Sequence, residues 1–83
     1  MFYVYLLKSP DHGQIYVGYT ADLKRRYAEH QKLPRHNGWK LIYYEAYLNS
    51  EDALKRERKL KQYGSSMALL KKRLAESLEL SRI

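Results

Sequence analysis

Residues 16–30 carry the feature that most constrains this chain, a short β run that breaks at Gly18 and continues with a helical pattern. Side chains follow one another at about 100° around a helix, so one side of this helix carries Leu23, Arg26, Tyr27, His30 and Leu33. A stripe of this kind normally faces the core and is aliphatic. Because a buried cation is costly unless an anion meets it, we expect Arg26 and His30 to point into a pocket beside the preceding strand.

The remaining pattern predicts three strands and three helices. Apolar and aromatic runs at residues 2–7, 14–19 and 40–48 predict the strands, and turn residues at 9–13 join the first two as a hairpin. The first helix is expected to begin after an N-cap at Thr20 and to end near residue 32, before Pro34. Two more helices are expected, one from residue 50 to about 63 and one from 66 to about 78.

The predicted fold class is α+β. We expect a small three-stranded antiparallel sheet flanked by three helices, in the order β-β-α-β-α-α. The strands are apolar on both faces, which indicates that helices cover both sides of the sheet. A length of 83 residues allows one domain, residues 1–83, with a core spanning about 2–78.

Charge and aromatic content favour a nucleic-acid partner. Sixteen Lys and Arg residues against nine Asp and Glu give a net charge of +7, and a positive field of this size attracts polyanions. Nine tyrosines are able to stack on bases. The alternative interpretation is a basic surface that only solubilises the protein.

Other classes of protein are disfavoured by what the sequence lacks. No run of about 18 apolar residues occurs, so we expect no membrane span and no membrane partner. Without cysteine there is neither a disulfide framework nor a thiolate metal site. The apolar N-terminus is short and has no basic lead, which fits a first strand rather than a signal peptide, and we expect a cytoplasmic location. His12, His30 and His36 are spread over a turn, a helix and a connection, which does not predict a metal cage.

The second predicted helix also has a charge on its apolar side. Ala53, Leu54 and Leu60 define that side and Glu57 lies among them, whereas Arg56 is expected to point elsewhere. A carboxylate in such a stripe must meet a cation, a metal or a proton. The alternative to a functional role is an internal salt bridge from Glu57 to Arg26 or His30, because structural ion pairs give the same pattern.

Two tyrosines are distinguished by their positions in the predicted hairpin. Aromatic residues are favoured in strands for packing alone, and packing is the simplest reading of any single tyrosine here. Tyr5 and Tyr16, however, lie on the two arms of one hairpin, and Tyr16 comes shortly before Gly18. A glycine at that point allows another backbone or a ligand to come close.

Together these residues resemble the GIY-YIG nuclease domain. In that family a Gly-Ile-Tyr strand is followed by Tyr-Ile-Gly, then by an arginine on the first helix and a glutamate on a later helix. The corresponding positions here are Tyr3-Val4-Tyr5, Tyr16-Val17-Gly18, Arg26, His30 and Glu57. The similarity extends from residue 2 to about 75 and is greatest to small stand-alone bacterial members. The chain departs from the pattern at Tyr3, which replaces the first glycine, and at Tyr19, where some branches carry lysine.

The resemblance implies a phosphodiester hydrolase that uses one divalent cation, Mg²⁺ or Mn²⁺. Its implied catalytic residues surround one shallow cleft and are Tyr5, Tyr16, Arg26, His30 and Glu57. Glu57 would hold the metal, and Arg26 would stabilise charge on the phosphate. One tyrosine, Tyr16 in preference to Tyr5, would take a proton from the attacking water, with His30 assisting.

The implied partner is nucleic acid, DNA rather than RNA, cleaved according to its structure or damage and not its base sequence. The oligomeric state is left open. The main alternative is a non-catalytic nucleic-acid-binding module with the same basic surface, in which Arg26 and Glu57 form a structural ion pair. A protein-interaction adaptor would leave the charges on apolar stripes unexplained.

Overall fold

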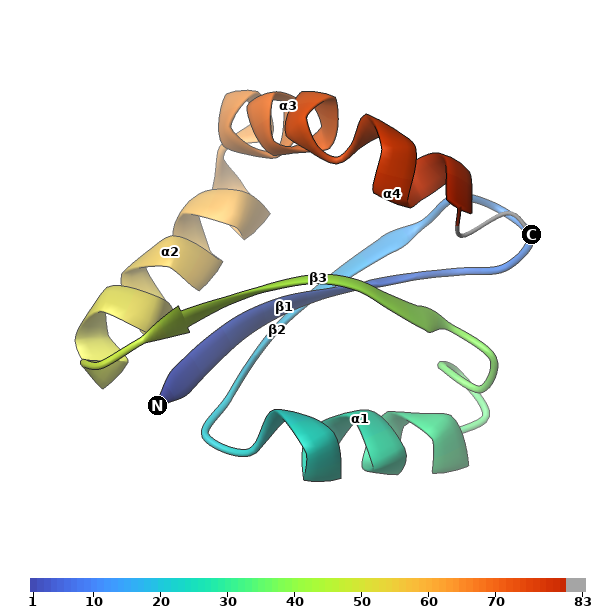
Figure 1. The fold of residues 1–83 in the computed structure, drawn as a ribbon, viewed down its shortest axis with the longest axis horizontal. Coiled ribbons are helices and arrows are strands. Elements are labelled where there is room, and N and C mark those ends of the chain that lie inside the picture. Colours follow the sequence, from blue (N-terminus) through green and yellow to red (C-terminus); the bar gives the residue numbers. More distant parts are fainter. Residues whose placement is uncertain (81–83) are drawn as a thin grey trace.

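The structure is a computed structural model that describes residues 1–80, so the last three residues of the expected domain lie outside it. Its three strands are β1 (Phe2–Lys8), β2 (Ile15–Thr20) and β3 (Lys40–Tyr47), which form an antiparallel sheet in the order β2-β1-β3. The helices are α1 (Leu23–Lys32), α2 (Ser50–Gln62), α3 (Gly64–Arg73) and α4 (Ala75–Leu80) (Figure 1). The predicted α+β class is confirmed. The single helix expected after residue 66 is interrupted at Leu74 and forms both α3 and α4.

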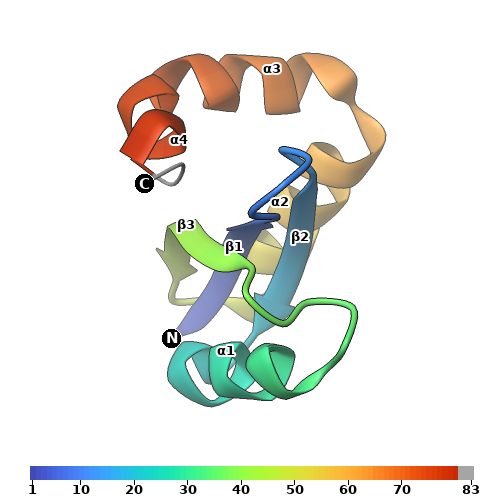
Figure 2. The same ribbon diagram turned by 90° about the vertical axis from the view of Figure 1, so that its right-hand side faces the viewer.

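Helices cover both faces of the sheet, as expected. Figures 1 and 2 show α1 on one side of the sheet and α3 and α4 on the other. The core lies on the side of α2 and α3, where buried apolar side chains from the sheet meet buried leucines and an alanine of the helices: Val4, Leu6, Val17, Ala53, Leu60, Leu70 and Leu74. In the part of the chain that is described, no helix has both the length and the apolar character needed to cross a membrane.

The connection between β2 and α1 places the first helix against the sheet. Thr20 was expected to cap this helix, but that prediction is wrong, because the N-cap is Asp22, whose carboxylate accepts a hydrogen bond from Arg25 N at 3.1 Å. The Thr20 hydroxyl instead accepts from Asp22 N at 3.1 Å and so tightens the turn. Helix α1 therefore starts immediately after the edge strand and folds back over it.

A half-buried ion pair attaches α2 to β3, and the expected orientation of Arg56 is therefore wrong. Arg56 is half-buried, and its Nε and Nη2 donate to Oε1 and Oε2 of Glu45 at 3.0 Å each. The hydroxyls of Tyr43, at 2.7 Å, and Tyr47 also donate to this carboxylate. Burial opposes the charged form of Glu45, but the hydrogen bonds outweigh it and lower its pKa. Arg56 is therefore a structural residue of α2, while Leu54, expected in the apolar stripe, is 38% exposed.

Candidate active site

Tyr5 is the buried centre of the candidate site. It lies in β1 opposite Gly18 of β2 and is only 1% exposed. A Cβ atom added to Gly18 would overlap Cζ and Oη of the Tyr5 ring. The close approach expected at Gly18 is therefore made by this side chain, and not by another backbone or by a ligand. Glycine at this position lets the Tyr5 ring cross β2.

His30 is the hydrogen-bond partner of the Tyr5 hydroxyl. The Tyr5 oxygen lies 2.7 Å from Nε2 of His30, and His30 is the buried residue of α1. Its expected inward orientation is confirmed. Burial, followed by the charge of Arg26 and the neighbouring His36, lowers the pKa of His30, so the imidazole is neutral at neutral pH. The sequence had suggested a cationic pair here, and for His30 that expectation is wrong.

Arg26 lies at the rim of the site and is not buried with His30. Its side chain is 38% exposed and forms an ion pair with Glu29 at 3.2 Å. Hydrogen bonds with Glu29 and then with Tyr5 raise the pKa of Arg26, and Tyr16 adds a weaker contribution. The guanidinium is thus open to solvent and close enough to both tyrosines for them to affect its pKa. In this position it is able to contact a phosphate group from outside.

Tyr16 completes the group on this face of the sheet. Its ring is half-buried and lies 6.2 Å from the Tyr5 ring and 5.0 Å from the imidazole of His30, centroid to centroid. Burial, and next the charge of Tyr16, raise the pKa of Tyr5 to about 12. Four of the five predicted residues, Tyr5, Tyr16, Arg26 and His30, therefore form one cluster between the sheet and α1.

His36 and Trp39 also belong to this cluster, and the sequence did not reveal them. Nδ1 of His36 lies 2.9 Å from Nδ1 of His30. The His36 ring is 4.7 Å from the ring of Tyr16 and 4.9 Å from that of Trp39. Burial and the charges of Arg35 and Arg26 lower the pKa of His36. A loop residue has no periodicity, so no signal in the sequence placed His36 next to His30.

Gln31 holds the loop that carries these two residues. Its Nε2 donates to the carbonyl of Trp39 at 2.8 Å, and its Oε1 accepts from Gly38 N at 3.1 Å. Its own carbonyl accepts from Nδ2 of Asn37 at 2.6 Å. The loop is thereby attached to α1 at several points. His36 and His30 are fixed relative to each other because both are supported by the same helix.

The five residues were expected to surround one shallow cleft, but Glu57 stands apart from the other four. It belongs to α2, which packs over the sheet face opposite α1, and its carboxylate pairs with Lys61 at 3.3 Å. Arg26 pairs with Glu29, so the internal salt bridge considered for Glu57 is not formed. Lys61 and Tyr16 line the same hollow of about 510 Å³ at the β2 edge of the sheet. Its lining thus includes one residue of the cluster, Tyr16, and the ion-pair partner of Glu57, Lys61.

The donor atoms around Glu57 suit one mode of metal binding. Within residues 1–80 no group of three or more acidic or histidine side chains converges on a possible metal position. Mg²⁺, however, keeps several waters and is often bound by one or two carboxylates together with substrate phosphates. Glu57, whose side chain is 17% exposed, fits this mode and does not fit a cage built by the protein alone.

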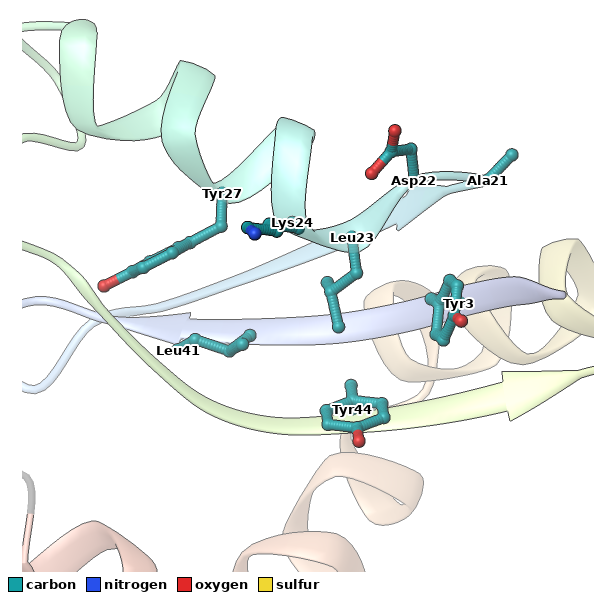
Figure 3. Close-up of a pocket in the computed structure, with 8 residues that line it drawn as sticks. All are labelled: Tyr3, Ala21, Asp22, Leu23, Lys24, Tyr27, Leu41 and Tyr44. Carbon is teal, nitrogen blue, oxygen red and sulfur yellow. The ribbon is translucent and has the colours of Figure 1, made fainter.

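A second hollow, of about 530 Å³, lies beneath the first half of α1. Figure 3 shows Leu23, Lys24 and Tyr27 of α1 facing Tyr3 and Tyr44 of the sheet across it. Packing between α1 and the sheet is therefore concentrated at the other half of the helix, around His30. The stripe expected on α1 is also loosely packed at its other end, where Leu33 is 42% exposed.

Comparisons with known proteins identify the family of this chain. The family model of the GIY-YIG catalytic domain matches residues 1–74. The "UPF0213 protein in ldhD 5'region" of Pediococcus acidilactici is 36% identical over 64 residues, which cover 68% of this chain and 64% of that relative. The chain thus spans just under two-thirds of the length of the relative it matches. No solved structure matches the chain. The match to the family model covers most of the sequence, and the chain belongs to the GIY-YIG family of nuclease domains.

Proposed function

We propose that this chain is a metal-dependent endonuclease that hydrolyses phosphodiester bonds in DNA, directed by the structure or damage of the substrate and not by its base sequence. The observation that carries the proposal is the cluster of Tyr5, Tyr16, Arg26 and His30 between the sheet and α1. GIY-YIG domains act on nucleic acid, generally DNA. The net charge of +7 favours a phosphate backbone, because cationic side chains replace its counterions.

Arg26 is the group suited to bind the phosphate that is cleaved. It is reachable from solvent, and its fork of donors matches phosphate oxygens. Charge builds on these oxygens in the transition state, and a fixed cation stabilises it. Glu29 holds the guanidinium in the free protein, and the phosphate takes over part of this role on binding.

Tyr16 is the better candidate for the base that takes a proton from the attacking water. Burial and the proximity of Tyr16 raise the pKa of Tyr5 to about 12, which makes Tyr5 a poor base at neutral pH. Tyr16 is half-buried, whereas Tyr5 is only 1% exposed, so an attacking water reaches the Tyr16 hydroxyl more easily. Tyr5 then orients the Tyr16 hydroxyl or the water.

Glu57 is the residue proposed to hold the divalent cation, Mg²⁺ or Mn²⁺. GIY-YIG nucleases generally use such a metal, and when bound it supplies positive charge to the phosphate and the leaving oxygen. Lys61 neutralises Glu57 in the free protein. On binding DNA, Lys61 is placed to pair with a phosphate at the hollow that it shares with Tyr16, which leaves the carboxylate available.

The charged groups near the cluster support recognition of DNA shape. Arg26 at the rim, and Lys61 and Lys71 in the hollow at the β2 edge, are suited to phosphates. Contacts to phosphates position a protein on DNA but carry no base sequence directly. We propose a cytoplasmic role in which branched or damaged DNA is incised.

Cleavage of a panel of labelled nucleic acids tests the proposal. Single strands, duplexes, flaps, junctions, abasic duplexes and their RNA counterparts are incubated with the protein, with and without Mg²⁺ or Mn²⁺. We expect metal-dependent incision of branched or damaged DNA, lost in Arg26→Ala and retained in Arg25→Ala, an exposed neighbour with the same charge. Folded wild-type protein that cuts none of these substrates would overturn the proposal.

A non-catalytic nucleic-acid-binding module is the second candidate. The observation in its favour is that Glu57 is already paired with Lys61, with no converging set of metal ligands among the described residues. This candidate predicts salt-sensitive binding to the same panel without cleavage at any metal concentration. Binding alone therefore does not separate the candidates, whereas incision does.

A further inference from the structure

Three side chains, Tyr5, His30 and His36, form a hydrogen-bonded row from the sheet to the loop after α1, and Tyr16 lies beside its sheet end. The ring of Tyr16 lies 6.2 Å from the ring of Tyr5 and 5.0 Å from the imidazole of His30, centroid to centroid. The Tyr5 hydroxyl lies 2.7 Å from Nε2 of His30, and Nδ1 of His30 lies 2.9 Å from Nδ1 of His36. We call Tyr16, Tyr5, His30 and His36 the tyrosine–histidine row.

The contact between the two imidazoles requires that only one of the two Nδ1 atoms carries a proton. Two Nδ1 atoms 2.9 Å apart form a hydrogen bond only when one of them carries a proton and the other does not. Burial is the largest cause that lowers the pKa of both His30 and His36, so both are neutral at neutral pH. A neutral imidazole has one N–H and one acceptor nitrogen. The two histidines must therefore be opposite tautomers.

The surroundings keep the two histidines neutral. The sheet contributes the hydroxyl of Tyr5 and the ring of Tyr16, and α1 contributes the cation of Arg26 and the carboxylate of Glu29. Their connecting loop adds the cation of Arg35. Both cations lower the pKa of a neighbouring histidine, and only Glu29 acts in the opposite direction.

We propose that the tyrosine–histidine row is a proton path, in which His36 releases to water the proton that Tyr16 must lose to act as a base. The proposal rests on the proposed nuclease function, which gives Tyr16 that role. Tyr5 and His30 are each 1% exposed, whereas His36 is half-buried and is the member at the loop end of the row. A nucleic acid bound at Arg26 covers Tyr16, and His36 then remains as the exit.

The transfer is balanced in protons and moves no electrons. In the proposed path the Tyr16 hydroxyl turns toward Tyr5 and donates to it. Tyr5 donates to Nε2 of His30, Nδ1–H of His30 donates to His36, and His36 carries Nε2–H. Each donated proton then passes to its acceptor, and the Nε2 proton of His36 leaves to water. Tyr16 becomes a phenolate, while the other three groups end with the number of protons with which they began. Both histidines exchange tautomers in the process.

The tautomers of the three histidines give a direct test that does not depend on activity. Two-bond ¹H–¹⁵N correlation spectra at neutral pH report which ring nitrogen carries the proton, and exposed His12 serves as the internal reference. We expect His30 to carry its proton on Nδ1 and His36 on Nε2. In His36→Ala, Nδ1 of His30 loses its acceptor, and we expect His30 to shift toward the Nε2–H form. Two Nε2–H histidines in the wild type would overturn the proposal.

Chemical rescue tests the exit itself. We expect His36→Ala to lower metal-dependent cleavage by about tenfold, below the 10²–10⁴-fold typical of a direct acid–base group. Added imidazole should restore part of the lost rate, and His12→Ala should cleave as the wild type does. A lost rate that imidazole does not restore, in a variant with unchanged melting temperature, would show that His36 only supports the fold of the loop.

The nuclease proposal and the proton-path proposal would be overturned by different results. Opposite tautomers in a protein that cuts no substrate would overturn the nuclease proposal and leave the hydrogen-bonded row in place. Cleavage by a wild type in which both histidines carry Nε2–H would retain the nuclease and remove the proton path. The spectra are recorded on the free protein, so they do not require a known substrate.

Discussion

At the scale of single residues, the site depends on Gly18, a residue without a side chain. Gly18 leaves the space that the Tyr5 ring occupies, and this brings the Tyr5 hydroxyl to His30. The glycine of the second motif is thereby explained by packing between two strands and needs no special backbone conformation, because its φ is not positive. The motif tyrosine of β1 and the motif glycine of β2 form one structural unit.

The first prediction concerns this contact. In Gly18→Ala the new methyl group overlaps Cζ and Oη of Tyr5, so the buried ring must move and the hydrogen bond to His30 is lost. Forcing extra volume into a packed site typically costs about 1–3 kcal/mol, and thermal unfolding should show a lower melting temperature. Gly64→Ala is the control, because nothing lies within 4 Å of its added Cβ. Equal melting temperatures for the two variants would contradict the packing argument.

A second prediction at this scale separates the two candidate functions at Glu57. Glu57→Gln keeps the shape of the side chain and removes its charge, so metal-dependent cleavage should fall by about 100-fold or more, since changes outside the ligand shell alone cost 10–100-fold. Loss of the ion pair with half-exposed Lys61 should cost less than about 1 kcal/mol. Glu51→Gln, an exposed position on the same helix, is the control. Unchanged cleavage by Glu57→Gln would remove Glu57 from the site.

At the scale of elements, the two faces of the sheet are held by different means. Helix α1 buries His30 against β1 and is attached to the following loop through Gln31. Helix α2 buries Ala53 and Leu60 in the core. It is further attached to β3 by the bidentate pair of Arg56 with Glu45. Polar contacts therefore position α1 and the site, whereas apolar packing gives α2 most of its attachment.

The pair between α2 and β3 gives the third prediction. Arg56→Met keeps much of the side chain but leaves Glu45, which is 15% exposed, without its cation. Breaking a buried pair typically costs about 3–5 kcal/mol, and exposure of the arginine side chain puts the expected loss at the lower end. In a domain of this size that corresponds to a fall of about 10 °C or more in melting temperature. Arg58→Met, on the exposed side of the same helix, should unfold within a few degrees of the wild type.

At the scale of the whole molecule, charge and protonation determine how the protein responds to its solvent. The net charge of +7 creates the field that draws nucleic acid toward the protein. Arg26 provides a cation at the rim of the cluster, and Lys61 and Lys71 provide two at the hollow beside it. Neutral His30 and His36 lie inside the same region. We therefore expect salt to change the affinity for DNA and pH to change the stability of the fold.

Binding to DNA should weaken steeply as salt rises. If Arg26, Lys61 and Lys71 each neutralise a phosphate, the log–log slope of affinity against salt is about −2.7, or about 40-fold between 50 and 200 mM. Lys61→Ala should reduce the slope by about one. Lys55→Ala, exposed and about 120° around α2 from Lys61 by helical spacing, should reduce it by less. A slope near zero in fluorescence anisotropy titrations would show that this surface does not bind the backbone.

Stability should fall on mild acidification because of the two histidines. Burial lowers the pKa of His30 and of His36 in the folded state. At pH values between these lowered pKa values and about 6.5, the unfolded chain therefore binds more protons than the folded chain. The free energy of unfolding is therefore highest above pH 6.5 and declines as pH falls through the folded pKa values. Melting temperatures between pH 7.5 and 5 should show this decline, and His12→Ala should show it equally. A flat profile over this range would contradict neutral burial of both rings.

Local sequence determined the elements and their order. Hydrophobic periodicity and turn residues identified the three strands, the positions of α1 and α2, and the inward orientation of His30, because these depend on neighbours along the chain. The hairpin likewise predicted that Tyr5 and Tyr16 lie on adjacent strands, which the register confirms. The order of motifs was sufficient to indicate the nuclease family.

Tertiary structure alone decided the partners of the long side chains and of the loop. Periodicity indicated a face for Arg26, Arg56 and Glu57, but their flexible side chains reach anions or cations supplied by other turns and strands. It also gave no position for His36, which is fixed by hydrogen bonds between its loop and Gln31. A helical period specifies a direction to within one side of the helix, whereas an ion pair or a hydrogen bond depends on atoms that only the folded chain brings together.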